Sequence, residues 1–248
     1  MINIINTKNL GILKIKLIDK KLAKEIIIAN HYSHKWNEIG FGLYNFGIFR
    51  LENGQDGDCL GVASYGYMKN YKAKIFTHPN PDAWVIELNR MWIDDSLGKN
   101  AESVLISHSL KMLHKLDPNI AAVQSFADGR LGCGTIYKAS NFKFYGFHYT
   151  KFLCNRRTNE VTHEQNLTNS IHKSIYLRNN ISWLLKDFQI FRVKTYRYIY
   201  IFDKRIKFRF KEKPYPPYEK GQETVEWVRD TNKIIRNMVS MLETFKTV

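Results

Sequence analysis

The sequence has few cysteines and no long apolar run, and these absences exclude several classes of protein. Cys59, Cys133 and Cys154 form an odd set without a C-x-x-C spacing, so neither a disulfide framework nor a zinc knuckle is indicated. No apolar run approaches the roughly 18 residues that a membrane-spanning helix needs. The start at Met1 lacks the basic residues and apolar stretch of a signal peptide. We therefore expect a cytoplasmic protein that does not enter a membrane.

Acidic residues are also scarce beside basic ones. The 248 residues include 38 Lys and Arg against 23 Asp and Glu, which gives a formal net charge of +15. Within residues 143–213 alone there are 16 basic and 5 acidic side chains. Such an excess favours binding to a polyanion, because each neutralised phosphate releases condensed counterions. A solvated basic surface is the alternative interpretation.

The apolar fraction of 44% is that of a folded protein, and the periodicity of these residues predicts an α/β fold with a mixed central sheet flanked by helices. Strands are expected at residues 13–17, 41–49, 59–67, 85–93, 120–126, 143–152, 192–202 and 206–210. Helices are expected at residues 20–29, 99–116, 135–139, 181–188 and 222–245.

The same patterns predict how these elements pair and divide into domains. The strands at 41–49 and 59–67 should form an antiparallel hairpin, and those at 192–202 and 206–210 another. The strand at 120–126 should run parallel to 85–93, across the intervening helix. Residues 155–165 read as a polar loop. We expect a catalytic core at 1–152, a basic aromatic extension at 153–218 and a C-terminal amphipathic helix at 219–248.

One charged residue interrupts the apolar strand at 85–93. Strand alternation would place Glu87, Asn89 and Met91 on one face, and Leu88, Arg90 and Trp92 on the other. A charge in a central strand needs a partner or a ligand. Arg90 is therefore either a functional residue or half of a structural ion pair.

Polar and aromatic residues also gather at the ends of predicted elements. Asp128 follows the strand at 120–126, where ligands bind in α/β sheets, although an Asx-turn would also explain an aspartate there. The segment 194–200 interleaves cations with aromatics and predicts base stacking together with phosphate contacts. Its alternative is a hairpin that covers the core with snorkelling lysines.

The segment from Val85 to Gly146 carries a resemblance to known proteins. Its order of strand, glycine turn, helix, strand and short helix, with the run Tyr137-x4-Phe142-x3-Gly146, resembles the acyl-donor half of the GNAT acyltransferase superfamily. The amino-acid sequences of several segments resemble more closely those of the phage-encoded Mom proteins, which modify adenine bases in DNA. Those segments are Asn30-His31-Tyr32-Ser33, Glu87-Leu88-Asn89-Arg90, Ala127-Asp128, Ile136-Tyr137-Lys138-Ala139-Ser140-Asn141-Phe142 and the basic, tyrosine-rich run that ends near Tyr218.

This resemblance implies a GNAT-like fold with a basic C-terminal extension and an enzyme that adds a carbamoylmethyl group to the exocyclic amino group of adenine in phage DNA. The product would protect the DNA from restriction. An N-acyltransferase of a protein or small molecule, and a catalytically inactive DNA-binding protein, are the alternatives. The implied catalytic residues are His31, Tyr32, Arg90, Asp128 and Tyr137, with the tyrosine phenol as acid or hydrogen-bond donor.

The implied binding residues fall into two groups. Donor contacts are expected from Asn89, Met91, Ile93, Gly98 and Lys99. DNA contacts are expected from Trp36, Lys194, Tyr196, Arg197, Tyr198, Arg205 and Arg209, and a flipped adenine would stack on Tyr32 or Trp36.

The turn that precedes the helix at 99–116 does not identify the donor of the transferred group. Acetyl coenzyme A is the donor by family analogy, but Asp94 and Asp95 occupy the turn where its pyrophosphate would lie, and of the family's usual pattern only Gly98 is present. A glycyl group carried on tRNA is the alternative. His31, Tyr32 and Asp128 are also candidates to hold a metal ion.

Overall fold

The computed structural model describes residues 2–69, 73–163, 188–218 and 225–228. The chain forms two compact units. Unit 1 comprises Met1–Ala127, Cys133–Gly146 and Tyr196–Tyr218, and unit 2 comprises Asp128–Gly132, Phe147–Thr195 and Glu219–Val248. Each unit is described below by itself.

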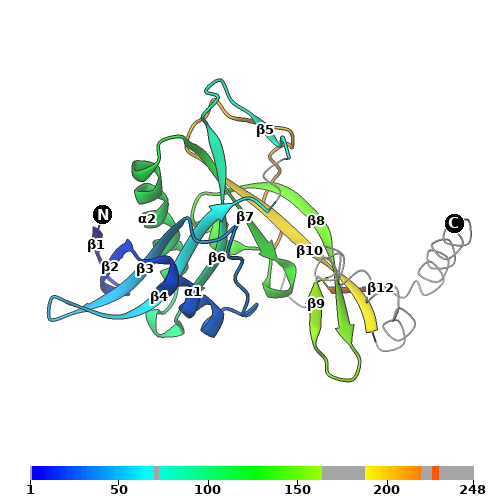
Figure 1. The fold of residues 1–248 in the computed structure, drawn as a ribbon, viewed down its shortest axis with the longest axis horizontal. Helices are drawn as coiled ribbons and strands as arrows, with labels where there is room; N and C mark the ends of the chain where they lie inside the picture. Colours follow the sequence, from blue (N-terminus) through cyan, green and yellow to red (C-terminus); the bar gives the residue numbers. More distant parts are fainter. Residues whose placement is uncertain (1, 70–72, 164–187, 219–224, 229–248) are drawn as a thin grey trace, which may run out of the picture. The chain divides into compact units, whose positions relative to one another are not determined.

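The described elements build a mixed sheet with few helices (Figure 1). The helices are α1 (Lys20–Asn30), α2 (Ala101–Leu116) and α3 (Thr135–Ala139), with short 3-10 turns η1 (Asp95–Leu97) and η2 (Gly129–Leu131). The strands are β1 (Ile2–Thr7), β2 (Gly11–Leu17), β3 (Tyr44–Glu52), β4 (Gln55–Tyr67), β5 (Phe76–Thr77), β6 (Trp84–Ile93), β7 (Ile120–Asp128), β8 (Lys143–Asn155), β9 (Val161–His163), β10 (Phe188–Ile201), β11 (Lys207–Phe208) and β12 (Val225–Val228). The main sheet has the order β1-β2-β3-β4-β6-β7-β10-β8-β9, and β12 pairs with β10.

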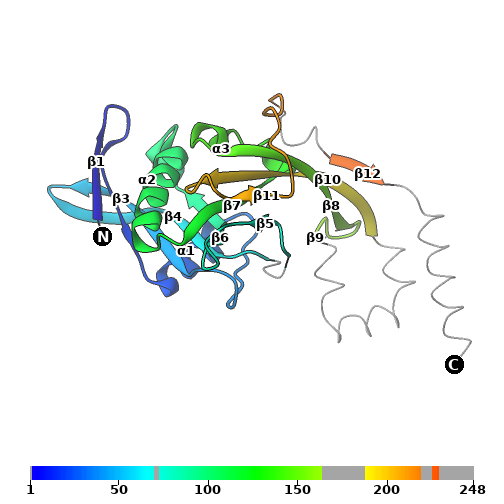
Figure 2. The ribbon, with the colours of Figure 1, turned by 90° about the horizontal axis from the view of Figure 1, so that it is seen from above.

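The two longer helices cover opposite faces of the sheet in unit 1 (Figure 2). Asp19 caps α1 by accepting a hydrogen bond from the Leu22 N–H, and Ala23 and Ile27 of this helix pack with Val62 of β4. The next residue of β4, Ala63, belongs instead to the large core cluster that contains the apolar side of α2. Successive strand residues point to opposite faces, so this alternation places one helix on each side.

An irregularity in β6 decides which of its side chains share a face. Ser64 of β4 pairs with Arg90, but the next residue, Tyr65, pairs with Leu88, so Asn89 is an extra residue in β6. Such a bulge shifts the alternation of the strand. Consequently Leu88 and Met91, three residues apart, both pack against the core that contains α2. The predicted strict alternation is wrong at this point, and Glu87 and Arg90 lie on the same face.

The parallel pairing of β6 with β7 is short. It runs from Trp84 opposite Ile120 to Glu87 opposite Gln124, whereas β6 continues to Ile93 and β7 to Asp128. Beyond the Glu87–Gln124 pair, no further register between the two strands is formed, and Ser125 reaches across with a side-chain hydrogen bond to the Leu88 carbonyl at 3.1 Å. The end of this ladder is the point around which the polar residues of unit 1 gather.

Unit 2 contains the outer part of β8, the hairpin strand β9 and the first part of β10. Phe152, Phe191 and Val193 form a small buried cluster on one face of these strands. On the other face Phe147 and Tyr149 expose 49% and 40% of their surface, and Lys194 and Arg192 lie over their rings. Among the described residues, this face therefore combines exposed aromatic rings with positive charge.

Most predicted elements are confirmed, including the α/β class, the mixed sheet, the antiparallel β3–β4 hairpin, the parallel β6–β7 pair and α3 at its predicted bounds. The strand, turn, helix, strand and short helix on which the GNAT resemblance depends are likewise present in order. No helix among the described residues is long and apolar enough to cross a membrane.

Three predictions about the C-terminal third are wrong in the described residues. Part of the expected loop at 155–165 is β9, which pairs with β8. The strand at 207–208 pairs with β5 rather than with β10. Within the helix predicted for 222–245, Val225–Val228 is a strand on β10, because its alternating apolar residues also suit an extended chain. The remainder of that helix, and all but Phe188 of the one predicted at 181–188, lie outside the described residues; Phe188 itself begins β10.

Candidate active site

A buried carboxyl group, Glu87, lies at the centre of the polar cluster in unit 1. Its two oxygens accept hydrogen bonds from Gln124 Nε2 at 3.2 Å and from Asn89 Nδ2 at 3.4 Å. Burial raises the pKa of this carboxyl above its usual value, and the amide hydrogen bonds and the charge of Arg90 oppose that shift only in part. A carboxylate held in this way is a stronger base than one in water.

Arg90 faces this carboxylate across the bulge. Its Nη1 donates to the Asn89 carbonyl at 2.7 Å and its Nε to the Lys35 carbonyl at 3.3 Å, while the guanidinium lies 4.6 Å from the centre of the Phe41 ring. Burial lowers its pKa, and Tyr32 and Glu87 counteract this. Arg90 and Glu87 interact electrostatically without a direct ion pair within 4.0 Å among the described contacts, so the predicted alternative of a simple structural ion pair is not what the structure forms.

His31 and Tyr32 follow α1 and lie beside Arg90. The Ser33 backbone N–H donates to His31 Nδ1 at 3.1 Å, which leaves Nε2 to carry the proton of the neutral ring. Burial, then the charges of Arg90 and His34, lower the His31 pKa to about 4, so the ring is neutral at pH 7. The Tyr32 ring lies tilted against this ring, with 4.3 Å between the ring centres, and is itself 52% exposed, which leaves much of its surface open to a ligand.

Tyr137 of α3 lies next to Ser125, just past the last residue pair of the β6–β7 ladder. Ser125 Oγ and the Tyr137 phenol are 3.0 Å apart, and the ring stacks on Tyr198 at 5.0 Å. Burial raises the Tyr137 pKa to about 12, and the nearby Tyr32 and Glu87 add to the effect. The phenol therefore keeps its proton at neutral pH, which suits a hydrogen-bond donor or acid rather than a base.

The predicted donor residues divide between strand and turn. Asn89 is buried in the bulge, and the side chains of Met91 and Ile93 pack against the core, so these two can offer only backbone groups to a ligand. Gly98 adopts a φ of 81°, and Lys99 is exposed in the turn before α2. Asn100, in the left-handed region, leaves the start of α2 without a side-chain cap.

This turn does not fit the pyrophosphate of coenzyme A. The Asp94 carboxylate accepts a hydrogen bond from the Ser96 N–H at 2.9 Å, so it occupies a backbone donor that would otherwise serve an anion. Asp95 and Glu102 add two further carboxylates, and Lys99 is the one cation between Asp94 and Glu102. Arg50, whose Nη2 donates to the Ser96 carbonyl at 3.0 Å, and Lys99 are two cations against these three carboxylates, so a pyrophosphate would meet a net negative charge at this turn.

Asp128 belongs to unit 2, where it begins η2. Its carboxylate accepts a hydrogen bond from the Arg130 N–H at 3.0 Å and two from the Arg130 guanidinium at 3.0 and 2.6 Å. The guanidinium lies 4.1 Å from the centre of the Phe152 ring. The turn interpretation of Asp128 thus describes its local geometry, and its catalytic role stays a prediction. In the described part of the chain no group of three or more His, Cys, Asp or Glu side chains is arranged to hold a metal ion.

Two of the predicted DNA-stacking residues are core residues. Tyr196 and Tyr198 are each 1% exposed, and the Tyr198 phenol donates to the Cys133 carbonyl. The prediction that they stack on bases is wrong, because the alternation of β10 turns these rings toward α3 and β8. Trp36 is half-buried against the cluster of Ala23, Ile27 and Val62, so Tyr32 is the exposed aromatic of its loop.

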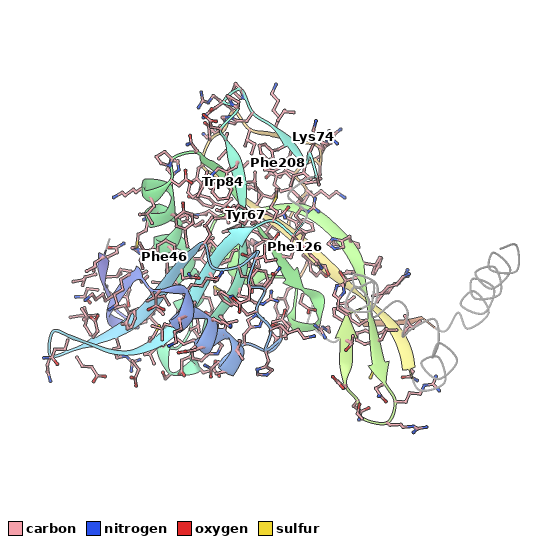
Figure 3. All side chains as sticks on the ribbon, in the orientation of Figure 1. Phe46, Tyr67, Lys74, Trp84, Phe126 and Phe208 are labelled. Atoms are coloured by element: carbon pink, nitrogen blue, oxygen red, sulfur yellow. The ribbon has the colours of Figure 1, made fainter. Side chains whose placement is uncertain are left out.

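The predicted basic DNA contacts differ in their freedom to reach a phosphate. Arg197 is half-buried between the rings of Phe126, which Figure 3 labels on β7, and Phe210. Arg205 is exposed but held by two hydrogen bonds to Asp203, at 3.0 and 2.6 Å. Arg209 is exposed in unit 1, and Lys194 lies in unit 2 at 5.4 Å from the Phe147 ring centre. Glu87, Gln124 and Phe147 were not predicted as functional, since only the three-dimensional register reveals what surrounds them.

The chain is similar to known proteins over most of its length. The model of the Mom protein family matches residues 12–217. The methylcarbamoylase mom of Escherichia phage Mu is 34% identical over 215 residues, which cover 82% of this chain and 83% of that protein.

Solved structures with partial likeness are acetyltransferases. The ribosomal-protein-S5-alanine acetyltransferase from Vibrio fischeri has a TM-score of 0.43 at 10% identity, covering 82% of this chain and 98% of that one. The aminoglycoside acetyltransferase AAC(6')-Ib in complex with coenzyme A and kanamycin has a TM-score of 0.36 at 13% identity, covering 64% and 98%.

Proposed function

The chain belongs to the Mom protein family, and on that premise we propose that it is a transferase that modifies adenine bases in phage DNA. The group transferred would be carbamoylmethyl, and the acceptor would be the exocyclic amino group of adenine. The observation that carries the proposal is the buried Glu87, which Gln124 and Asn89 hold by hydrogen bonds and which interacts electrostatically with Arg90 and Tyr137. Tyr32 in turn interacts with both Arg90 and Tyr137, so three family-like residues gather in unit 1.

Each of these residues has a part that its surroundings support. The exposed Tyr32 ring offers a face on which a flipped adenine would stack, since an enzyme that acts on a duplex base must take it out of the helix. Arg90, fixed by two backbone carbonyls, would orient a carbonyl or leaving group of the donor. Tyr137, with its raised pKa, would give a proton or hydrogen bond to the departing group.

The donor would be bound through contacts other than the turn at Asp94–Asn100. In this proposal the backbone of Asn89, Met91 and Ile93, beyond the last β6–β7 pair, takes the donor chain. A glycyl group on tRNA remains the candidate that suits the net charge of +15. Asp128 would hold the base or the donor, as the family resemblance implies.

DNA would be gripped by exposed rings and cations rather than by Tyr196 and Tyr198. Phe147 and Tyr149 of unit 2, with Lys194 and Arg192 over them, combine a stacking surface with positive charge. This pairing is typical of surfaces that bind unpaired bases and phosphates together. Arg205 and Arg209 are exposed cations of unit 1, and we propose phosphate contacts for them independently of that surface.

Restriction of DNA from expressing cells tests the proposal. Plasmid from a host that expresses the protein should resist endonucleases whose sites contain adenine, and should still be cut by an enzyme that recognises GGCC. Plasmid from cells expressing Arg90→Ala should be cut by both. Equal cutting of wild-type and Arg90→Ala plasmid, with folded protein in both hosts, would refute the proposed activity.

A further inference from the structure

Glu87 and Gln124 occupy a special place in the fold, because they are the last matched pair of the parallel β6–β7 ladder. Both strands continue past them, to Ile93 and Asp128, without further register. Two polar side chains at the end of a ladder between buried strands are costly unless they meet a ligand or one another. Ligands of α/β proteins bind where neighbouring strands part in this way.

One acceptor atom of this pair receives no hydrogen bond from the described residues. Gln124 Nε2 donates to Glu87 Oε2, and Gln124 Oε1 is buried with no hydrogen-bond partner in the described part of the chain. Gln124 is 4% exposed. An unmatched buried acceptor lowers the stability of the fold, so its presence indicates a hydrogen-bond donor that a ligand would bring.

Asn89 Oδ1 is also without a partner, but its surroundings differ. A Cβ added at Gly66 would lie 2.4 Å from this oxygen, so the oxygen faces the backbone of β4. Asn89 Nδ2 is meanwhile fixed by Glu87 and by the Tyr67 carbonyl at 3.3 Å. Asn89 therefore positions Glu87, and the acceptor left for a ligand is Gln124 Oε1.

The charged and titratable groups around Glu87 come from four elements. Arg90 of β6, Arg197 of β10, Tyr137 of α3 and Lys69, which follows β4, all interact with it electrostatically. All four are hydrogen-bond donors in their neutral-pH states. The three cations disfavour a positively charged ligand, so the group that fits Glu87 and Gln124 is a neutral nitrogen with two N–H bonds.

We propose that Glu87 and Gln124 form the acceptor site for the exocyclic amino group of adenine: Gln124 Oε1 accepts one N–H, and Glu87 accepts the other and removes its proton. The step rests on the proposed function. The nitrogen lone pair forms a bond to the electrophilic carbon of the donor, whose leaving group departs with the bonding electron pair. The amino proton passes to the Glu87 carboxylate, and Tyr137 supplies a proton or hydrogen bond to the leaving group.

This arrangement also discriminates adenine from guanine. Adenine presents an amino group where guanine presents a carbonyl oxygen, and an oxygen there would face the Glu87 and Gln124 oxygens without a proton between them. A site built to accept N–H bonds rejects a group that lacks them, because buried acceptors then stay unmatched.

Variants of the full-length protein test the inference by transfer kinetics on DNA. Glu87→Gln keeps the shape of the side chain and removes the base, and we expect kcat to fall by at least about 100-fold with a smaller change in KM. Gln124→Met should lower activity on adenine, because it removes the Oε1 acceptor. Glu52→Gln, at the exposed end of β3, is the matched control and should be unchanged.

Two further readouts separate a base from a structural residue. Added formate should restore part of the activity of Glu87→Ala, and the acidic limb of the wild-type pH profile should be absent in Glu87→Gln. If the wild type modifies adenine and Glu87→Gln is equally fast, the inference is overturned while the proposed function stands. A folded Glu87→Ala variant that formate leaves inactive would overturn the inference in the same way. A wild type that leaves adenine unmodified would instead refute the proposed function.

Discussion

Glu87 and Arg90 lie on the same face of β6 although they are three positions apart, because Asn89 is an extra residue opposite β4. The bulge brings a buried carboxylate and a fixed guanidinium to the end of the β6–β7 ladder, within electrostatic reach of Tyr32 and Tyr137. Without it, Arg90 would face the apolar core that packs on α2. The bulge therefore assembles the site.

The Tyr137 phenol should matter more for transfer than for stability. Tyr137→Phe removes its hydroxyl but leaves Ser125 bonded to the Leu88 carbonyl, so we expect a loss of about 1 kcal/mol in the free energy of unfolding. Transfer to adenine should fall at least about 100-fold. Tyr44→Phe, which loses a hydrogen bond to Asp117 elsewhere in unit 1, is the control. Full activity of Tyr137→Phe would remove the acid role.

The salt dependence of DNA binding should report the cations that we propose to contact phosphate. Neutralising Lys194, Arg205 and Arg209 together should lower the slope of log affinity against log salt by up to about 2.7, if each contacts a phosphate. Arg197 is left unchanged because it is half-buried and interacts with Glu87. The matched triple variant at Lys21, Lys111 and Lys115 should keep the wild-type slope. The same slope in both triple variants would place the DNA elsewhere.

Acetyl coenzyme A should bind poorly, because Asp94, Asp95 and Glu102 surround the start of α2. Replacing Asp95 and Glu102 with Asn and Gln should strengthen whatever binding exists, since it removes two repelling charges. Titration calorimetry measures both. Micromolar affinity of the wild type would show that the uncapped helix start outweighs the carboxylates.

Acid should destabilise the protein partly through His31. Its folded-state pKa is about 4, below the ordinary value of 6.5, so the unfolded chain binds a proton that the folded chain does not. This contribution to stability is complete above about pH 6.5 and is lost as pH falls toward 4. Urea unfolding at pH 7.5 and 4.5 should show a larger acid loss for wild type than for His31→Gln. Equal losses would mean that His31 titrates normally.

The elements with a clear apolar period could be predicted from the sequence, and the register between them could not. The 16 residues of α2 and the strand that follows it have unambiguous periods, and a parallel crossover follows from their order. The sequence does not single out Glu87, because no local pattern shows that Gln124 lies opposite it. Nor does it predict the bulge at Asn89, since a two-residue period assumes that nothing is inserted.

The aromatic stretch of β10 illustrates a second limit. Alternation showed that Tyr196 and Tyr198 share a face, but either face of a strand can be the buried one. The core of unit 1 takes these two rings, and the exposed rings are Phe147 and Tyr149 on β8. Composition predicts cations interleaved with aromatics, but it does not show which strand presents its rings to solvent.

The mass of the nucleosides tests the central claim most directly. DNA from cells expressing the wild-type protein should yield a deoxyadenosine heavier by one carbamoylmethyl group, and fragmentation should leave the extra mass on the base after loss of deoxyribose. Folded Arg90→Ala, Asp128→Ala and Glu87→Gln variants should yield ordinary deoxyadenosine. A nucleoside pool from wild-type cells that matches that of cells without the protein, or an added mass on another base, would contradict the account.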